Sequence, residues 1–133
     1  AKWLEVPLAI VEKRKNGDGE FEVENLIGDV YGKKVILIDD MINTGKTVCN
    51  AADALIKNGA TEVYCCATHA VFSDYAVKRL KESVIKEVVV TDTIELREDE
   101  YFEKLTVLST AKIFGEAVKR IVVYKEMSNL FVK

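Results

Sequence analysis

Proline is nearly missing from this sequence, in which Pro7 is the only one among 133 residues. Seven glycines and no low-complexity run argue against a disordered chain. No apolar run approaches the roughly 18 residues that a membrane span needs, and no secretory signal is visible. Basic and acidic residues are interspersed, without the basic stripe of a nucleic-acid-binding protein. We therefore expect one cytoplasmic domain over residues 1–133, with no nucleic-acid or membrane partner.

Metal-ligating residues are also scarce. Cys49, Cys65 and Cys66 are the only cysteines, and their odd number and lack of CxxC spacing exclude a disulfide framework and a zinc site. His69 is the only histidine. Because no second ligand type stands at metal spacing from it, we interpret His69 as a site-wall or structural residue. We expect reduced thiols and no metal-ligating cluster.

Short apolar runs alternate with helical patterns along the whole chain. Strands are predicted at residues 8–11, 21–24, 35–38, 63–67, 87–90 and 106–108. Helices are predicted at residues 44–57, 74–81 and 111–122. The continuous apolar run 35–38 is typical of a strand buried on both faces of a parallel sheet. The alternation predicts an α/β fold with a mostly parallel sheet flanked by helices, and ligands bound at the carboxyl ends of the strands.

A dense group of polar residues follows the strand at 35–38. Two carboxylates end the strand and a hydroxyl-rich turn opens the next helix: Asp39, Asp40, Asn43, Thr44, Gly45, Lys46 and Thr47. The backbone N–H groups of such a turn and of the helix N-terminus form an anion site, and Gly45 lets the backbone approach a phosphate closely. The hydroxyls can donate to phosphate, while the carboxylates can accept from sugar hydroxyls or hold Mg²⁺ through its water shell. The segment therefore predicts a site for a phosphorylated sugar.

Two other interpretations of this segment compete with the sugar-phosphate site. Gly45-Lys46-Thr47 matches the end of a P-loop, but that motif needs a glycine where Asp40 stands, and a carboxylate there would repel the phosphate. In the second interpretation, two acids end a strand and a threonine caps a helix, with no ligand involved. The combination of carboxylates, hydroxyls and a glycine at one turn favours the sugar-phosphate site over both.

The sequence also resembles a known family. Residues 35–47 resemble the phosphoribosyl-diphosphate motif shared by type I phosphoribosyltransferases and ribose-phosphate pyrophosphokinases. Landmarks of the second family are resembled, in order, by residues 13–15, 25–30, 67–73, 83–94 and 128–131. The resemblance covers nearly all 133 residues and implies a type I phosphoribosyltransferase-like fold. It matches only the second half of that two-domain enzyme. A chain that opens at Ala1 agrees with the expectation that a first half, with most of the ATP site, is absent.

The resemblance implies a ribose-phosphate diphosphokinase, which transfers diphosphate from Mg-ATP to the anomeric hydroxyl of ribose 5-phosphate and releases AMP. It makes Lys13 and Lys15 catalytic residues of a mobile loop at 13–19, Asp39 the ribose-contacting acid, and 43–47 the 5-phosphate loop. Ser128 and Phe131 match a regulatory phosphate-binding segment. Ribose 5-phosphate and ATP are the implied partners, Mg²⁺ the implied cofactor, and a homo-oligomer the implied assembly. We expect this chain alone to be inactive.

Four positions depart from the family pattern. Lys15 replaces the usual arginine, Asn43 the usual aspartate, Lys46 a small residue, and Glu126 a serine of the regulatory segment. Lysine keeps the charge of arginine but loses its bidentate fork. These departures leave open a non-catalytic regulatory homologue that binds phosphate or nucleotide and associates with the true synthetase. A stand-alone phosphoribosyltransferase would need a nucleobase pocket and an acceptor loop, neither of which we identify.

Overall fold

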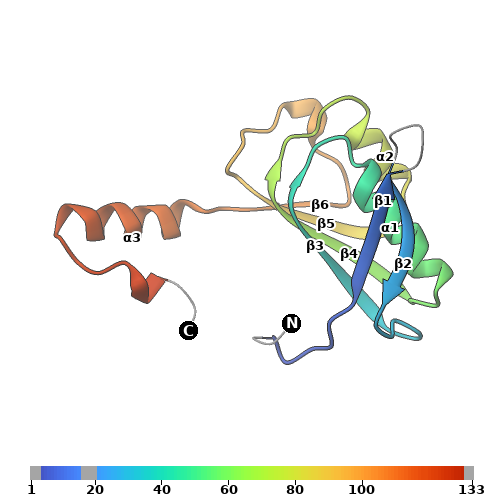
Figure 1. The fold of residues 1–133 in the computed structure, drawn as a ribbon. Helices are drawn as coiled ribbons and strands as arrows, with labels where there is room; N and C mark the ends of the chain where they lie inside the picture. The colour runs from blue at the N-terminus through green and yellow to red at the C-terminus, as the bar shows by residue number, and fades with distance from the viewer. Residues whose placement is uncertain (1–3, 16–20, 131–133) are drawn as a thin grey trace.

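The computed structural model describes residues 4–15 and 21–130, leaving out the side chains of residues 13–15 and 21–24. β1 (Ile10–Lys15) and β2 (Phe21–Ile27) form an antiparallel hairpin. The rest of the chain alternates between strands and helices: β3 (Lys34–Ile42), α1 (Lys46–Lys57), β4 (Glu62–Ala70), α2 (Ala76–Glu82), β5 (Ile85–Thr91), β6 (Leu105–Leu108) and α3 (Ala111–Val122). Strands β3 to β6 form one parallel sheet in sequential order (Figure 1). The predicted α/β fold with a mostly parallel sheet is confirmed.

The hydrophobic core lies between the sheet and the helices α1 and α2. α1 buries one stripe at helical spacing, made of Val48, Ala51, Ala52 and Leu55, and α2 buries Ala76 and Leu80. Alternate residues of β4 and β5 are also buried in this core: Val63, Cys65, Ala67, Val88 and Val90. The hairpin lies beside this layer, where β2 contacts α1. The core therefore supports the carboxyl end of β3 and the start of α1 from one side.

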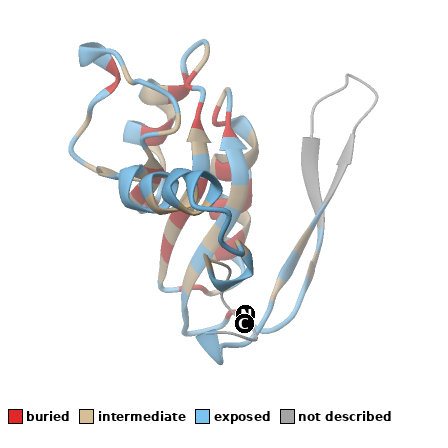
Figure 2. Ribbon diagram, turned by 90° about the vertical axis from the view of Figure 1, so that its left-hand side faces the viewer, coloured by how far each residue is buried: buried red, intermediate tan, exposed pale blue. Residues whose placement is uncertain are grey.

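The prediction that the 35–38 strand is buried on both faces is wrong. Ile36 and Ile38 are 56% and 74% exposed, while Val35 and Leu37 pack against the core. β3 is an edge strand of the sheet, and its side chains alternate between the helix-covered face and the opposite face. No residue of α3 is buried (Figure 2), and this helix projects away from the sheet (Figure 1). The face that carries Ile36 and Ile38 is therefore left open.

Several element ends differ from the prediction. β3 continues through Asp39 and Asp40, and β4 continues through His69, because the parallel ladder pairs Met41 with His69. Helix α1 begins at Lys46 and not at Thr44. Residues 13–15, predicted to belong to a mobile loop, lie in β1 and pair with β2; residues 16–19 of that loop lie outside the described residues.

None of the helices within residues 4–15 and 21–130 combines the length and the apolar character that crossing a bilayer requires. The thiols of Cys49, Cys65 and Cys66 are free, as predicted. Cys65 is buried in the core, while Cys66, its neighbour on the strand, is half-buried on the other face. Burial raises the pKa of the Cys65 thiol to about 12, so this cysteine is an inert core residue.

Candidate functional site

A cavity of about 320 Å³ opens where β3 ends and α1 begins. It is lined by Asp39, Met41, Ile42, Asn43, Thr44, Gly45, Lys46, Thr47, Val48 and Asn50. The cavity thus brings together Asp39 and the whole predicted loop at residues 43–47. Its position at the carboxyl end of a parallel strand is where ligands of α/β sheets bind.

Asp39 and Asp40 follow each other in β3 but lie in different surroundings. Asp39 is half-buried in the cavity lining, whereas Asp40 is exposed and lies outside the lining. Asp39 Oδ1 accepts a hydrogen bond from the N–H of Asp40 at 3.0 Å, and Asp40 Oδ1 accepts from the N–H of Met41 at 2.7 Å. One oxygen of each carboxylate is therefore directed to the backbone. Asp39 is the carboxylate that a ligand in this cavity would meet.

The backbone at the start of α1 has the shape of an anion site. Gly45 is the N-cap residue, with φ of 74°, and its carbonyl accepts the first helical hydrogen bond from Cys49 N–H at 3.1 Å. A left-handed residue at the end of such a turn directs successive N–H groups into one concavity. No acidic residue stands in the first turn, so no carboxylate competes with an incoming anion for the positive end of the helix dipole.

Helix capping does not account for this turn. No side chain caps α1, and Thr44 Oγ1 lies 3.5 Å from the N–H of Lys46, which is long for a hydrogen bond. Asp40, where a P-loop would need glycine, is a strand residue. No polar side chain of the turn therefore serves as the N-cap of α1, as the interpretation without a ligand requires.

Four residues of the lining were not predicted as site residues: Met41, Ile42, Val48 and Asn50. Met41 is the next residue of β3 on the same side as Asp39, and Asn50 lies on α1. Asn50 follows Lys46 by four residues and Thr47 by three, which puts the three side chains on one face of the helix. The helical spacing that predicted the core stripe of α1 was thus sufficient to identify Asn50 as well.

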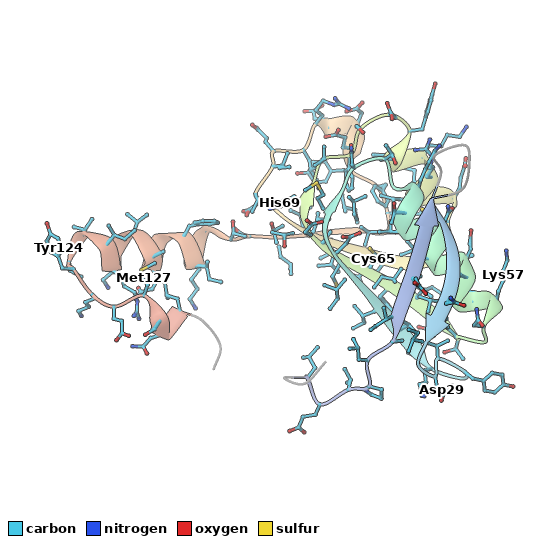
Figure 3. All side chains as sticks on the ribbon, viewed as in Figure 1. Asp29, Lys57, Cys65, His69, Tyr124 and Met127 are labelled. Atoms are coloured by element: carbon cyan, nitrogen blue, oxygen red, sulfur yellow. The ribbon has the colours of Figure 1, made fainter. Side chains whose placement is uncertain are left out.

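His69 lies at the carboxyl end of β4 (Figure 3) and outside the cavity lining. Its Nδ1 is 2.8 Å from the hydroxyl oxygen of Thr93. The Thr93 hydroxyl is in turn 3.1 Å from the carbonyl oxygen of Thr68. The half-buried ring is therefore held by a network that joins the ends of β4 and β5, in agreement with a structural role.

Within the part of the chain that the structure describes, no three His, Cys, Asp or Glu side chains converge on a point that could hold a metal ion. Mg²⁺ commonly keeps several waters and binds through one or two carboxylates together with substrate phosphates. Asp39, beside a loop shaped for a phosphate, fits binding through one carboxylate and a substrate phosphate, which needs no cluster of three protein ligands. The donor set is therefore suited to a hydrated Mg²⁺ that arrives with a phosphorylated ligand.

Of the predicted catalytic and regulatory residues, only Ser128 has a described side chain, and it is not part of the cavity lining. Lys13 and Lys15 pair with Val23 and Phe21 across the hairpin, and their side chains are not among those described. Ser128 donates a hydrogen bond to Glu126 Oε1 at 2.6 Å, and Phe131 lies outside the described residues. The roles of these residues stay predictions.

Comparison with known proteins matches residues 8–132 to the family model described as the phosphoribosyl synthetase-associated domain. A ribose-phosphate pyrophosphokinase of Caldanaerobacter subterraneus subsp. tengcongensis is 52% identical over 131 residues, which are 98% of this chain and 42% of that protein. The chloroplastic ribose-phosphate pyrophosphokinase 1 of Oryza sativa subsp. japonica is 49% identical over 120 residues, or 90% of this chain and 30% of that protein. The chain thus spans well under half of these relatives.

A solved structure is also similar. The crystal structure of phosphoribosylpyrophosphate synthetase from Mycobacterium smegmatis superposes with a TM-score of 0.82 at 39% sequence identity. The match covers 92% of this chain and 40% of that one. Fold and sequence therefore agree on the same group of proteins.

Proposed function

Because the chain belongs to the phosphoribosyl synthetase-associated domain family, we propose that it supplies the ribose 5-phosphate site of a ribose-phosphate diphosphokinase. In that reaction the anomeric hydroxyl of ribose 5-phosphate attacks the β-phosphorus of ATP, the bond to AMP breaks, and 5-phosphoribosyl 1-diphosphate forms. The observation that carries the proposal is one cavity that combines an anion-shaped loop with the carboxylate of Asp39. A phosphorylated sugar needs donors for its phosphate and acceptors for its hydroxyls, and this cavity offers both.

The loop at residues 43–47 would hold the 5-phosphate. Backbone N–H groups of the turn, the hydroxyls of Thr44 and Thr47, and the N-terminus of α1 meet at the cavity. Lys46 adds a positive charge beside the same anion. Each charge-assisted hydrogen bond of this kind contributes roughly 1.5–3 kcal/mol, so a few of them suffice to anchor one end of the sugar.

Asp39 would accept hydrogen bonds from the ribose hydroxyls and thereby orient the ring. With the phosphate held at the loop and the ring held at Asp39, the anomeric hydroxyl points out of the cavity toward the nucleotide. Mg²⁺ would come with the phosphates of ATP and neutralise part of their charge. Asp39 is the carboxylate of the cavity lining that would hold its water shell.

Lys13 would neutralise charge on the transferring group and on the departing phosphate of AMP, as the resemblance implies. The same resemblance assigns most of the ATP site to a preceding domain, and it implies a homo-oligomer. One relative is chloroplastic, so the cytoplasmic location expected from the sequence stays a prediction.

Titration of the chain with ribose 5-phosphate, followed by amide chemical shifts in NMR spectra, tests the proposal. We expect shifts at residues 43–47 and at Asp39 with ribose 5-phosphate, and at the loop alone with inorganic phosphate. Ribose without phosphate serves as the control and should bind much more weakly. Shifts confined to other parts of the chain would overturn the proposal.

A further inference from the structure

The carbonyl groups that lead into the cavity loop are hydrogen-bonded to the segment between β4 and α2. The carbonyl of Ile42 accepts from the N–H of Val71 at 3.0 Å and from that of Phe72 at 3.1 Å. The carbonyl of Asn43 accepts from the N–H of Ser73 at 3.1 Å. The side chains of Asn43 and Ser73 are also hydrogen-bonded to each other. The carbonyls of the last residue of β3 and of the first residue of the loop at residues 43–47 therefore face the same segment between β4 and α2.

The next carbonyl of the loop is held by a side chain. Arg79, a half-buried residue of α2, donates from Nη1 to the carbonyl oxygen of Thr44 at 2.6 Å. Arginine is permanently charged, so this is a charge-assisted hydrogen bond. It joins the cavity loop to a helix 35 residues farther along the chain.

The directions of these carbonyls set the directions of the next N–H groups. In a trans peptide unit the C=O of one residue and the N–H of the next point in opposite directions, and the described backbone holds no cis peptide. Because the carbonyls of Ile42, Asn43 and Thr44 face the β4–α2 side, the N–H groups of Asn43, Thr44 and Gly45 are turned away from it, toward the cavity. All three residues line that cavity.

The segment that holds the loop is itself fixed. Phe72 is 3% exposed, and its ring centre lies 6.3 Å from that of Phe102. Phe72 and Asp74 have positive φ values of 43° and 53°. Such conformations are strained and persist only where the surroundings hold them. The β4–α2 segment and α2 therefore form a firm support for the loop.

We propose that Arg79 is a positioning residue that fixes the Thr44–Gly45 peptide, so that the Gly45 N–H is presented to the phosphate of a bound sugar phosphate. The inference rests on the proposed function, whose site it deepens. Without the guanidinium this peptide is free to rotate. A rotated peptide would turn its carbonyl oxygen toward the anion, replacing a donor with an acceptor that repels phosphate.

The test compares Arg79→Met, which removes the donor, with Arg79→Lys, which keeps a donor and the charge. Lys78→Met removes one positive charge from an exposed position of the same helix and is the matched control. Affinity for ribose 5-phosphate is measured by calorimetry. The amide proton of Gly45 is followed by NMR before and after addition of inorganic phosphate, and urea unfolding checks that each variant is folded.

We expect Arg79→Met to weaken ribose 5-phosphate binding about tenfold or more, the effect of losing one such hydrogen bond. It should also abolish the downfield shift of the Gly45 amide proton on phosphate binding. Arg79→Lys should restore much of both, and Lys78→Met should change neither.

Several results would overturn the inference. Binding by Arg79→Met within twofold of the unmodified chain would do so, as would lost affinity with an unchanged Gly45 shift, since Arg79 would then act through its charge alone. The unmodified chain alone also provides a test. If phosphate shifts other amides of the loop but not the amide of Gly45, the inference is wrong. Absence of any ribose 5-phosphate binding by the unmodified chain would instead overturn the proposed function, and this inference with it.

Discussion

Asp39 and Asp40 are adjacent in the sequence, and at the level of the residue the strand separates them. Side chains of a β-strand alternate between the two faces of the sheet, so Asp39 enters the cavity while Asp40 is exposed outside it. The sequence identified both carboxylates as site residues because it does not show where the strand ends. Had β3 ended at Ile38, as predicted, both acids would have belonged to the loop and either could have faced a ligand.

Lys13→Ala should separate catalysis from binding in an active enzyme that contains this chain. If Lys13 contacts oxygens that gain charge as the bond to AMP breaks, that contact is stronger in the transition state than in the ground state. Steady-state kinetics should then show turnover lower by roughly 100-fold or more, with little change in the Michaelis constant for ribose 5-phosphate. Thr47→Val is the contrasting variant, and it should raise that Michaelis constant more than it lowers turnover. Turnover of Lys13→Ala within a few-fold of wild type would show that this lysine is an ordinary surface residue.

The elements themselves were well predicted where a periodic apolar pattern exists. α3 was predicted at its observed limits, and β4 and β5 from their apolar runs. The ends of β3 and β4 were not, because ladder hydrogen bonds between main chains continue past the apolar residues, through Asp39 and His69. Residues 13–15 are all basic and show no apolar strand pattern. They belong to β1 because they pair with β2, which the sequence does not show.

The candidate site was predicted to the extent that it is local in the sequence. Asp39 and residues 43–47 lie within nine positions of each other and carry a recognisable order of residue types. The support from Ser73 and Arg79 comes from residues 30 and 35 positions away from their partners. Contacts of that range depend on how α2 packs against α1, which no local pattern specifies.

Asp92 joins the ends of β5 and β6 to the start of α3 and should titrate at unusually low pH. Its Oδ2 accepts from the hydroxyl of Ser109 at 2.6 Å, and its Oδ1 accepts from the hydroxyl and the N–H of Thr110 at 2.6 and 2.7 Å. Led by the Ser109 bond, these hydrogen bonds lower the pKa of Asp92 from 3.8 to about 2. Because the folded-state pKa is depressed, their stabilising contribution is fully present above pH 3.8 and is lost as the pH falls through about 2.

A carbon-13 NMR titration of the carboxyl groups measures this directly. Ser109→Ala should move the Asp92 midpoint upward, toward 3.8. Asp29 is the internal control, because its pKa is lowered by its hydrogen bond from Lys33 and by the N–H of Tyr31, neither of which contacts Ser109. An Asp92 midpoint that does not respond to Ser109→Ala would contradict the assignment of these bonds.

For the molecule as a whole, we predict that the 133-residue chain forms no 5-phosphoribosyl 1-diphosphate by itself. The chain spans 42% of the Caldanaerobacter relative, and the family resemblance places most of the ATP site outside it. An assay for AMP release from ATP, with and without ribose 5-phosphate, should therefore give no difference. Binding of ribose 5-phosphate by the same preparation is the control for a folded site. AMP release that depends on the sugar phosphate would show that the chain is a complete enzyme.

The absence of buried residues in α3 has a consequence for how long its hydrogen bonds last. Its large apolar side chains are all exposed: Ile113, Phe114, Val118, Ile121 and Val122. A helix of 12 residues is only marginally stable in water without packing. We therefore expect its free energy of local opening to be close to zero and its amide hydrogens to exchange with solvent nearly as fast as in an unfolded peptide. α1 has the same length, but it opens only when the core opens. The protection of α3 amides therefore rises only to the extent that another surface covers its apolar stripe, and it is a direct measure of that coverage.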